Sequence, residues 1–146
     1  MGFRADVRAA AKDLLDGYKA ANPGTLRQVY PGRPASINPP TGFVDAINES
    51  SILYTAGPIQ RSPVAEIVLI QGLFDSKDAV EQQDALVDGF IAYVRANLHQ
   101  AGGSTLVTIA SVVDIPNFQP DWIVDAPIYY ATRLSLEGLM ISGSLV

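Results

Sequence analysis

The clearest pattern along the chain is a helical one between Asp75 and Gly103. Apolar residues recur there at the spacing that places them on one side of an α-helix: Val80, Leu86, Val87, Phe90, Ile91, Val94 and Leu98. The other side is polar, with Gln82, Gln83, Asp84, Asp88 and Arg95. We expect Asp75 or Ser76 to cap the beginning and Gly102 with Gly103 to end the helix. The stretch therefore predicts a long amphipathic helix that covers one face of a sheet.

A second helical pattern runs from about Arg4 to Ala21. Its apolar positions are Val7, Ala10, Ala11, Leu14, Leu15 and Tyr18. The residues that follow are Asn22, Pro23 and Gly24, and proline cannot continue a helix. This segment is predicted to be a second amphipathic helix.

Strand patterns fill much of the remaining chain. We expect strands at 26–30, 43–47, 51–56, 64–74, 105–115 and 128–137, a turn at 48–51, and a short extension at 122–124. Val64–Phe74 is apolar on both sides, which predicts a central position. Ile128–Glu137 alternates, which predicts a strand with one covered face. Irregular loops are expected at about 31–42, 57–63 and 116–121. The order predicts a single α+β domain over residues 1–146, with two helices packed on one face of a mainly antiparallel sheet.

Composition narrows the classes of function. The 146 residues include no cysteine, which excludes disulfides and thiolate chemistry. A net charge of −5 argues against a stand-alone nucleic-acid binder, because such proteins meet phosphates with Lys and Arg. No apolar run approaches the roughly 20 residues of a membrane-spanning helix. We therefore expect no membrane partner.

Candidate chemistry is sparse. The one histidine, His99, lies near the expected end of the long helix. Asp88, Asp114 and Asp125 are available as acids, but no spacing singles them out as partners of a nucleophile. One His and no Cys leave only an all-oxygen metal site, and no calcium-loop pattern is present. We expect no catalytic residue, no metal and no cofactor, and predict that the protein is not an enzyme.

Two groups of residues stand out as candidates for contacts. Arg27, Arg33 and Arg61 lie in or near the strand and loops of the first half, where they either contact phosphate or acidic partner surfaces or are solvated. Phe118 and Trp122 flank a proline-containing loop. Aromatic residues are enriched at the centres of interfaces, but both can equally fold back on the core.

The whole chain resembles the tail terminator (tail completion) proteins of long-tailed bacteriophages in the order and pattern of its segments. The resemblance rests on the helix Val7–Tyr18, the proline-rich segment Pro31–Asp45, the apolar strand Ala65–Gly72, the helix segment Asp84–Phe90 and the closing strand Ile128–Gly138. It implies a structural virion protein that caps the tail tube as a hexameric ring, ends tail polymerisation and joins the tail to the head connector. Closed rings use heterologous contacts between neighbouring subunits.

The resemblance also implies the partners and the location. They are further copies of the chain, the tail tube protein, and a head–tail connector or head-completion protein, with DNA only in passage through the lumen. The net charge of −5 suggests a separate hypothesis, an acidic lumen that repels the passing DNA. The protein would lie at the head-proximal end of the virion tail, and in the host cytoplasm during assembly. The interface candidates are Arg33, Pro34, Ile37, Pro39, Phe43, Tyr54, Ile59, Arg61, Phe118 and Trp122. Deletion of Gly32–Thr41 is expected to prevent ring formation or tail joining while the monomer still folds.

Two alternatives stay open. One is another head–tail joining protein, such as a neck or head-closure component. The other is a small α/β ligand-binding protein or enzyme, which would need a pocket with convergent polar groups around Asp114, Asp125 or His99.

Overall fold

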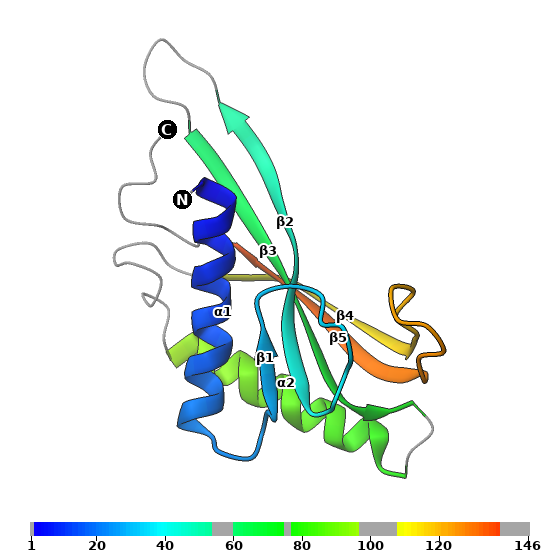
Figure 1. Ribbon diagram of the computed structural model, residues 1–146. Helices are drawn as coiled ribbons and strands as arrows, with labels where there is room; N and C mark the ends of the chain where they lie inside the picture. Colours follow the sequence, from blue (N-terminus) through cyan, green and yellow to red (C-terminus); the bar gives the residue numbers. More distant parts are fainter. Residues whose placement is uncertain (1, 54–59, 75–76, 97–107, 138–146) are drawn as a thin grey trace.

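The fold is an α+β domain with a mixed, mostly antiparallel sheet, as predicted (Figure 1). The computed structural model describes residues 2–53, 60–74, 77–96 and 108–137. Within these ranges the elements are α1 (Phe3–Ala21), β1 (Gln28–Tyr30), β2 (Thr41–Leu53), β3 (Gln60–Leu73), α2 (Ala79–Ala96), β4 (Thr108–Phe118) and β5 (Tyr129–Glu137). The strand order is β1-β2-β3-β5-β4. Only β1 and β2 are parallel, and β3 is central, as expected.

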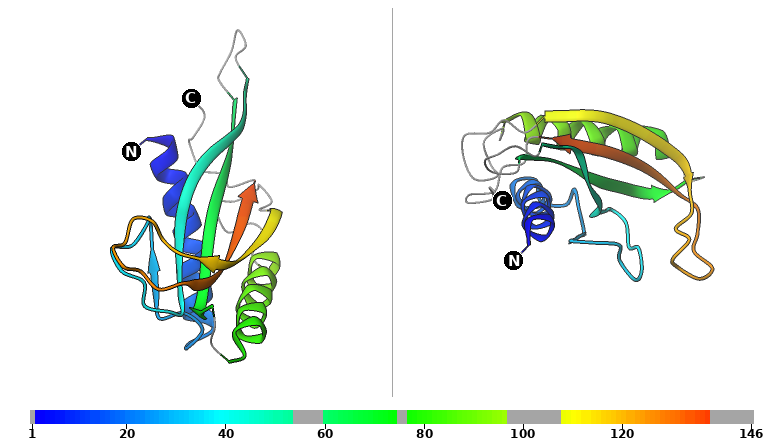
Figure 2. Two further views of the ribbon diagram at one scale, coloured as in Figure 1. Left: turned by 90° about the vertical axis from the view of Figure 1, so that its right-hand side faces the viewer. Right: turned by 90° about the horizontal axis from the view of Figure 1, so that it is seen from above.

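Both helices pack on one face of the sheet, which we call the helix face (Figure 2). The sheet contributes Val44, Ile47, Ala65, Ile67, Leu69, Leu134 and Leu136 to this core. All six apolar positions predicted for the first helix are buried there, and the helix ends at Ala21, directly before Asn22, as predicted. The i, i+3, i+4 spacing alone was sufficient to locate this buried stripe.

The two helices meet at Tyr18. Its ring centroid lies 5.6 Å from that of Phe90 and 5.8 Å from that of Tyr93. Gly17 and Gly89 make room for the contact, because a Cβ on either glycine would collide with a tyrosine hydroxyl from the facing helix. Burial raises the pKa of Tyr18 above its usual value of 10.0, and a hydrogen bond from Thr25 opposes this shift.

The buried side of α2 differs from the predicted stripe. Val80 is 54% exposed, whereas Gln83 is fully buried, and Leu86, Val87, Phe90 and Val94 are buried on the same side of the helix. Asp78 precedes the helix with a φ of 64°, and its carbonyl accepts a hydrogen bond from the Gln82 amide. The expected caps at Asp75, Ser76, Gly102 and Gly103, and also Leu98, lie outside the described residues.

Hydrogen bonds explain why a glutamine occupies the core. The pairing of β3 with β5 is irregular between Ile70 and Gly72, which leaves the Gln71 amide to donate to Gln83 Oε1 at 2.9 Å. Gln83 Nε2 donates to Leu69 O at 2.9 Å and to Thr132 Oγ1 at 3.0 Å. The side chain therefore satisfies backbone groups that the β-bulge frees.

The structure corrects several strand boundaries. β2 is continuous from Thr41 to Leu53, where the sequence suggested two short strands and a turn at 48–51. Register shifts between Val44 and Ile47 and between Glu49 and Ser51 absorb the irregularity, so pairing with β3 overrides the local turn preference. β3 begins at Gln60 and β4 continues to Phe118, so parts of the second and third expected loops are strand. Residues 122–124 form no strand.

The expectation that β5 has one covered face is also wrong. Tyr129 and Ala131 are buried on the side opposite the helices, together with Phe43, Val68 and Ile70. Loops rather than helices cover this second face (Figure 2). Loops carry no helical period, so the sequence pattern did not locate the segments that cover this face, although Val64–Phe74 is apolar on both sides.

We predict that Gln83→Leu lowers the free energy of unfolding by about 2–3 kcal/mol. The substitution hardly changes the side-chain volume, but it leaves the buried backbone groups that Gln83 bonds without hydrogen-bond partners. Gln82→Leu, at the exposed neighbouring position, should change it by less than about 0.5 kcal/mol. Urea unfolding followed by circular dichroism measures both. Equal midpoints for the two variants would contradict the assigned role of Gln83.

Candidate functional site

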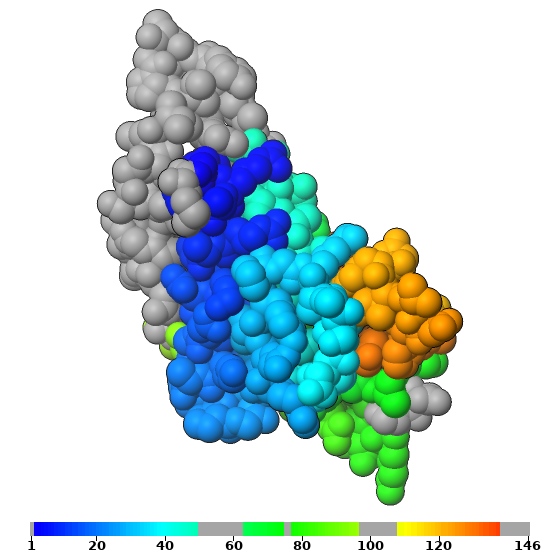
Figure 3. Space-filling view, in the orientation of Figure 1, coloured from blue at the N-terminus to red at the C-terminus, as the bar shows by residue number. Residues whose placement is uncertain are grey.

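The candidate site is the face of the sheet opposite the helices, which we call the loop face. Residues 31–40 and 119–128 lie over it, and the space-filling view shows these two segments side by side on the surface (Figure 3). Half-buried side chains of these segments and of the adjacent strands pack against the second core: Tyr30, Ile37, Ile115, Phe118 and Trp122. The proline-rich segment is therefore a layer of the fold.

Aromatic residues attach the proline-rich segment to the sheet. Trp122 Nε1 donates to Pro34 O at 2.8 Å, and the Tyr129 hydroxyl donates to Ile37 O at 3.3 Å. The Trp122 ring lies 6.0 Å from Phe43 between centroids, in an edge-on arrangement. Burial raises the pKa of Tyr129 above 10.0. These donors satisfy loop carbonyls that the packing would otherwise leave without partners.

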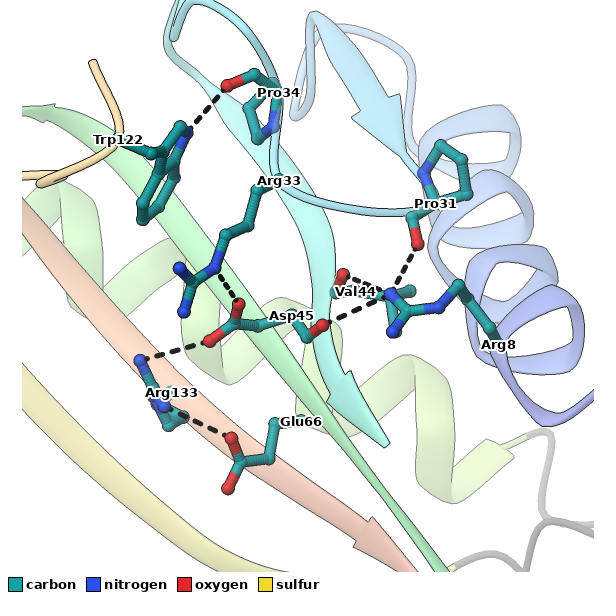
Figure 4. Close-up of polar contacts among 9 residues, drawn as sticks. All are labelled: Arg8, Pro31, Arg33, Pro34, Val44, Asp45, Glu66, Trp122 and Arg133. Carbon is teal, nitrogen blue, oxygen red and sulfur yellow. Dashed lines mark hydrogen bonds and ion pairs between the residues drawn. The ribbon is translucent and has the colours of Figure 1, made fainter. Parts of the chain in front are cut away.

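A row of alternating charges crosses the loop face (Figure 4). Arg33 Nε lies 2.7 Å from Asp45 Oδ1, Asp45 Oδ2 lies 3.4 Å from Arg133 Nη2, and Arg133 Nη1 lies 3.1 Å from Glu66 Oε2. The Asp45 side chain is only 5% exposed, whereas that of Arg33 is 53% exposed. The hydrogen bond to Asp45 raises the pKa of Arg33. The guanidinium also lies 4.6 Å from the centroid of the Trp122 ring, which is a cation–π contact.

Arg8 connects this layer to α1. Its Nη1 donates to Pro31 O at 2.7 Å, to Val44 O at 2.9 Å and to Asp45 O at 3.2 Å (Figure 4). One guanidinium therefore holds the beginning of the proline-rich segment against β2, and α1 stabilises both faces of the sheet.

The structure brings six of the ten interface candidates together on the loop face: Arg33, Pro34, Ile37, Phe43, Phe118 and Trp122. Phe43 is fully buried and Pro34 is buried, so neither can contact a partner, which corrects that expectation. For Phe118 and Trp122, an interface role and packing on the core were both left open. Both side chains fold back on the core.

The other candidates do not join this group. Pro39 is half-buried and precedes a cis peptide bond to Pro40. Tyr54 and Ile59 lie outside the described residues. Arg61 belongs to β3 and pairs with Ile52, and its side chain lies outside the described part of the structure.

The proposed deletion of Gly32–Thr41 would not leave a folded monomer. Thr41 is fully buried, begins β2 and donates from Oγ1 to Gln28 O at 3.0 Å. Removing the segment would also take the acceptors of Trp122 and Tyr129 away and uncover Phe43. The expectation is wrong because the segment belongs to the core, and tests of this face need point substitutions.

Sequence reasoning missed three members of the row of charges: Asp45, Glu66 and Arg133. Each is a charged residue inside a predicted strand, and this position was the one signal in the sequence that could have identified it as a candidate. Their proximity depends on the alignment of three strands that are far apart in the sequence, and the residues alone do not determine that alignment.

Other parts of the described structure hold less that suggests chemistry. Two hollows of about 300 Å³ and 480 Å³ lie near Gly24, and neither is lined by Asp114 or Asp125. Asp114 accepts a hydrogen bond from Thr132 Oγ1 at 2.9 Å, and His99 lies outside the described residues. Across residues 2–53, 60–74, 77–96 and 108–137, no group of three or more His, Asp or Glu could hold a metal ion.

Neither α1 nor α2, the helices of the described ranges, is long and apolar enough to cross a membrane. In comparisons with known proteins, no family model and no curated protein matches the chain.

We predict that Asp45→Asn lowers the free energy of unfolding by about 1–3 kcal/mol, because it leaves Arg33 and Arg133 close together without the carboxylate between them. Asp121→Asn is the matched control, since Asp121 is an exposed acid near the same arginine. The control substitution should change the free energy of unfolding by less than about 0.5 kcal/mol. Thermal and urea unfolding measure both variants. An Asp45 variant as stable as the control would show that the row of charges adds nothing to the fold.

Proposed function

We propose that this protein is a structural virion component, a tail terminator that caps the tail tube of a long-tailed bacteriophage as a hexameric ring and joins the tail to the head connector. The proposal combines the resemblance of the sequence to that family with the shape of the domain. It includes the tail tube protein and a connector or head-completion protein as partners, DNA only in passage, and no enzymatic activity.

The observation that carries the proposal is the extended end of the β2–β3 pair, which we call the distal ribbon. It comprises Glu49–Leu53 and Gln60–Pro63, which pair with each other, and within the described residues β5 pairs with β3 from Val64 onwards. The ribbon reaches past the N-terminal end of α1 (Figure 1). Two strands alone are marginally stable in water, so such a projection favours contact with another chain.

Exposed apolar side chains add support. Leu73, Phe74 and Ile128 lie together at the opposite end of the sheet, where the Phe74 amide donates to Ile128 O at 3.0 Å. An exposed apolar group at one end of the domain and a projecting pair of strands at the other suit a protein with neighbours on two sides, as a ring subunit between tube and connector has. The net charge of −5 is compatible with a lumen through which DNA passes without binding.

We predict that the purified protein, alone or with phage tail tubes, forms six-membered rings or caps on tube ends in negative-stain images, with a matching solution mass. The control is bovine serum albumin, an acidic protein without this fold, mixed with the same tubes. Binding to isolated head connectors but not to tubes would favour the alternative, a neck or head-closure protein. A monomer that binds neither would overturn the proposal.

A further inference from the structure

Two arginines of α1 supply donors to the edge of β2 that follows its pairing with β1. The pairing of β1 with β2 ends at Tyr30 and Phe43, and the next residue, Pro31, has no N–H with which to continue it. The carbonyl groups of β2 beyond this point therefore need donors from elsewhere. Arg8 Nη1 donates to Val44 O and Asp45 O, and Arg4 Nη1 donates to Ile47 O at 2.9 Å.

The guanidinium of Arg8 lies where the pairing of the two strands stops (Figure 4). The same nitrogen bonds Pro31 O on one chain and Val44 O on the other. The pairing of β2 with β3 is irregular between Val44 and Ile47, and such a bulge explains why two successive carbonyl groups both turn toward Arg8. The side chain thus takes the place that a continued β1 would occupy.

Arg4 continues this protection further along β2. While its Nη1 bonds Ile47 O, its Nη2 lies 3.2 Å from Glu49 Oε2. The Arg4 side chain is 57% exposed and that of Glu49 is 6% exposed, so a nearly buried carboxylate holds the guanidinium in place at the surface. The protected carbonyl groups therefore lie where an incoming strand would approach.

We propose that Arg4 and Arg8 form an edge cap, which keeps the β2 edge of one copy from pairing with the β2 edge of a second copy. A strand edge with free carbonyl groups is a template for another chain, and charged side chains at the edge block it. Every further copy carries the same edge, and two identical edges can pair in an antiparallel arrangement about a two-fold axis. This contact is separate from the ring and does not depend on the proposed function.

Charge alone would have the opposite effect. The net charge of the chain is −5, and replacing both arginines with neutral residues makes it −7. A more negative chain repels its copies more strongly and associates less. Stronger association after these substitutions would therefore report an uncovered strand edge and not the change in charge.

A matched pair of double variants tests the edge cap. One variant carries Arg4→Met and Arg8→Met. The control carries Lys12→Met and Lys19→Met, which remove two positive charges from the same helix at a residue paired with Asp16 and at an exposed residue. In sedimentation velocity, the arginine variant should form two-fold dimers, of the chain or of its assemblies, at concentrations at least tenfold below those that the control needs, about 1.4 kcal/mol. Equal association of the two folded variants would overturn the proposal.

Hydrogen exchange distinguishes edge pairing from unfolding. Pairing should slow amide exchange in peptides that cover residues 44–49 and leave residues 65–70 of β3 as protected as in the wild type. Association without slower exchange at 44–49 would place the contact elsewhere and overturn the proposal.

Faster exchange in both regions would mean that the double variant unfolds. Arg4→Met alone then decides, because it keeps the three bonds of Arg8 and changes a side chain that is mostly exposed. Its control is Lys12→Met. A folded Arg4 variant that associates no more strongly than this control would overturn the edge cap.

Discussion

The amide side chain of Gln83 fixes how α2 lies on the sheet. The bulge at Gln71 opens the pairing of β3 and β5, and the amide enters the gap to bond Leu69 O, the Gln71 amide and Thr132. Thr132 Oγ1 donates in turn to Asp114, so one polar chain joins α2, β3, β5 and β4. Buried polar groups of this kind are costly unless all are satisfied, so they permit very few orientations of the helix. The orientation they select exposes Val80 and sets Phe90 against Tyr18, where the two helices meet.

The second face of the sheet is covered differently. A helix satisfies its own backbone, whereas a loop laid on a core needs donors and acceptors from elsewhere. Here the indole of Trp122, the hydroxyl of Tyr129 and the guanidinium of Arg8 supply donors to the proline-rich segment. The prolines themselves lack an N–H and so reduce the number of donors that this layer must satisfy. The row from Arg33 to Glu66 then ties the loop to β2, β3 and β5 by charge.

The sequence predicted the features of the fold that depend on local residue patterns. It failed to predict those that depend on pairing between segments far apart in the chain. The stripe of α1, the central position of β3 and the α+β class follow from periodicity and from runs of apolar residues. Gln83 was placed on the polar side because its hydrogen bonds depend on a bulge in another strand. The polar residues 48–51 resembled a turn because local preference favours one, yet pairing with β3 extends the strand. At the loop face, Trp122 and Phe118 were identified as candidates, but the sequence did not decide whether they face a partner or the core. Asp45, Glu66 and Arg133 were missed because the register between strands is not a local property.

The helix α1 both completes the core and protects one edge of the sheet. Its apolar side covers the core, while Arg4 and Arg8 on its flank occupy the carbonyls of β2. The same element that completes the domain therefore also occupies carbonyl groups along one edge of the sheet, up to Ile47. A sheet open along both edges would associate in several registers, and such strands tend to aggregate. Protection of β2 up to Ile47 removes one such edge over that length. An assembly of defined geometry needs this restriction, because a ring closes only when every subunit repeats the same contact.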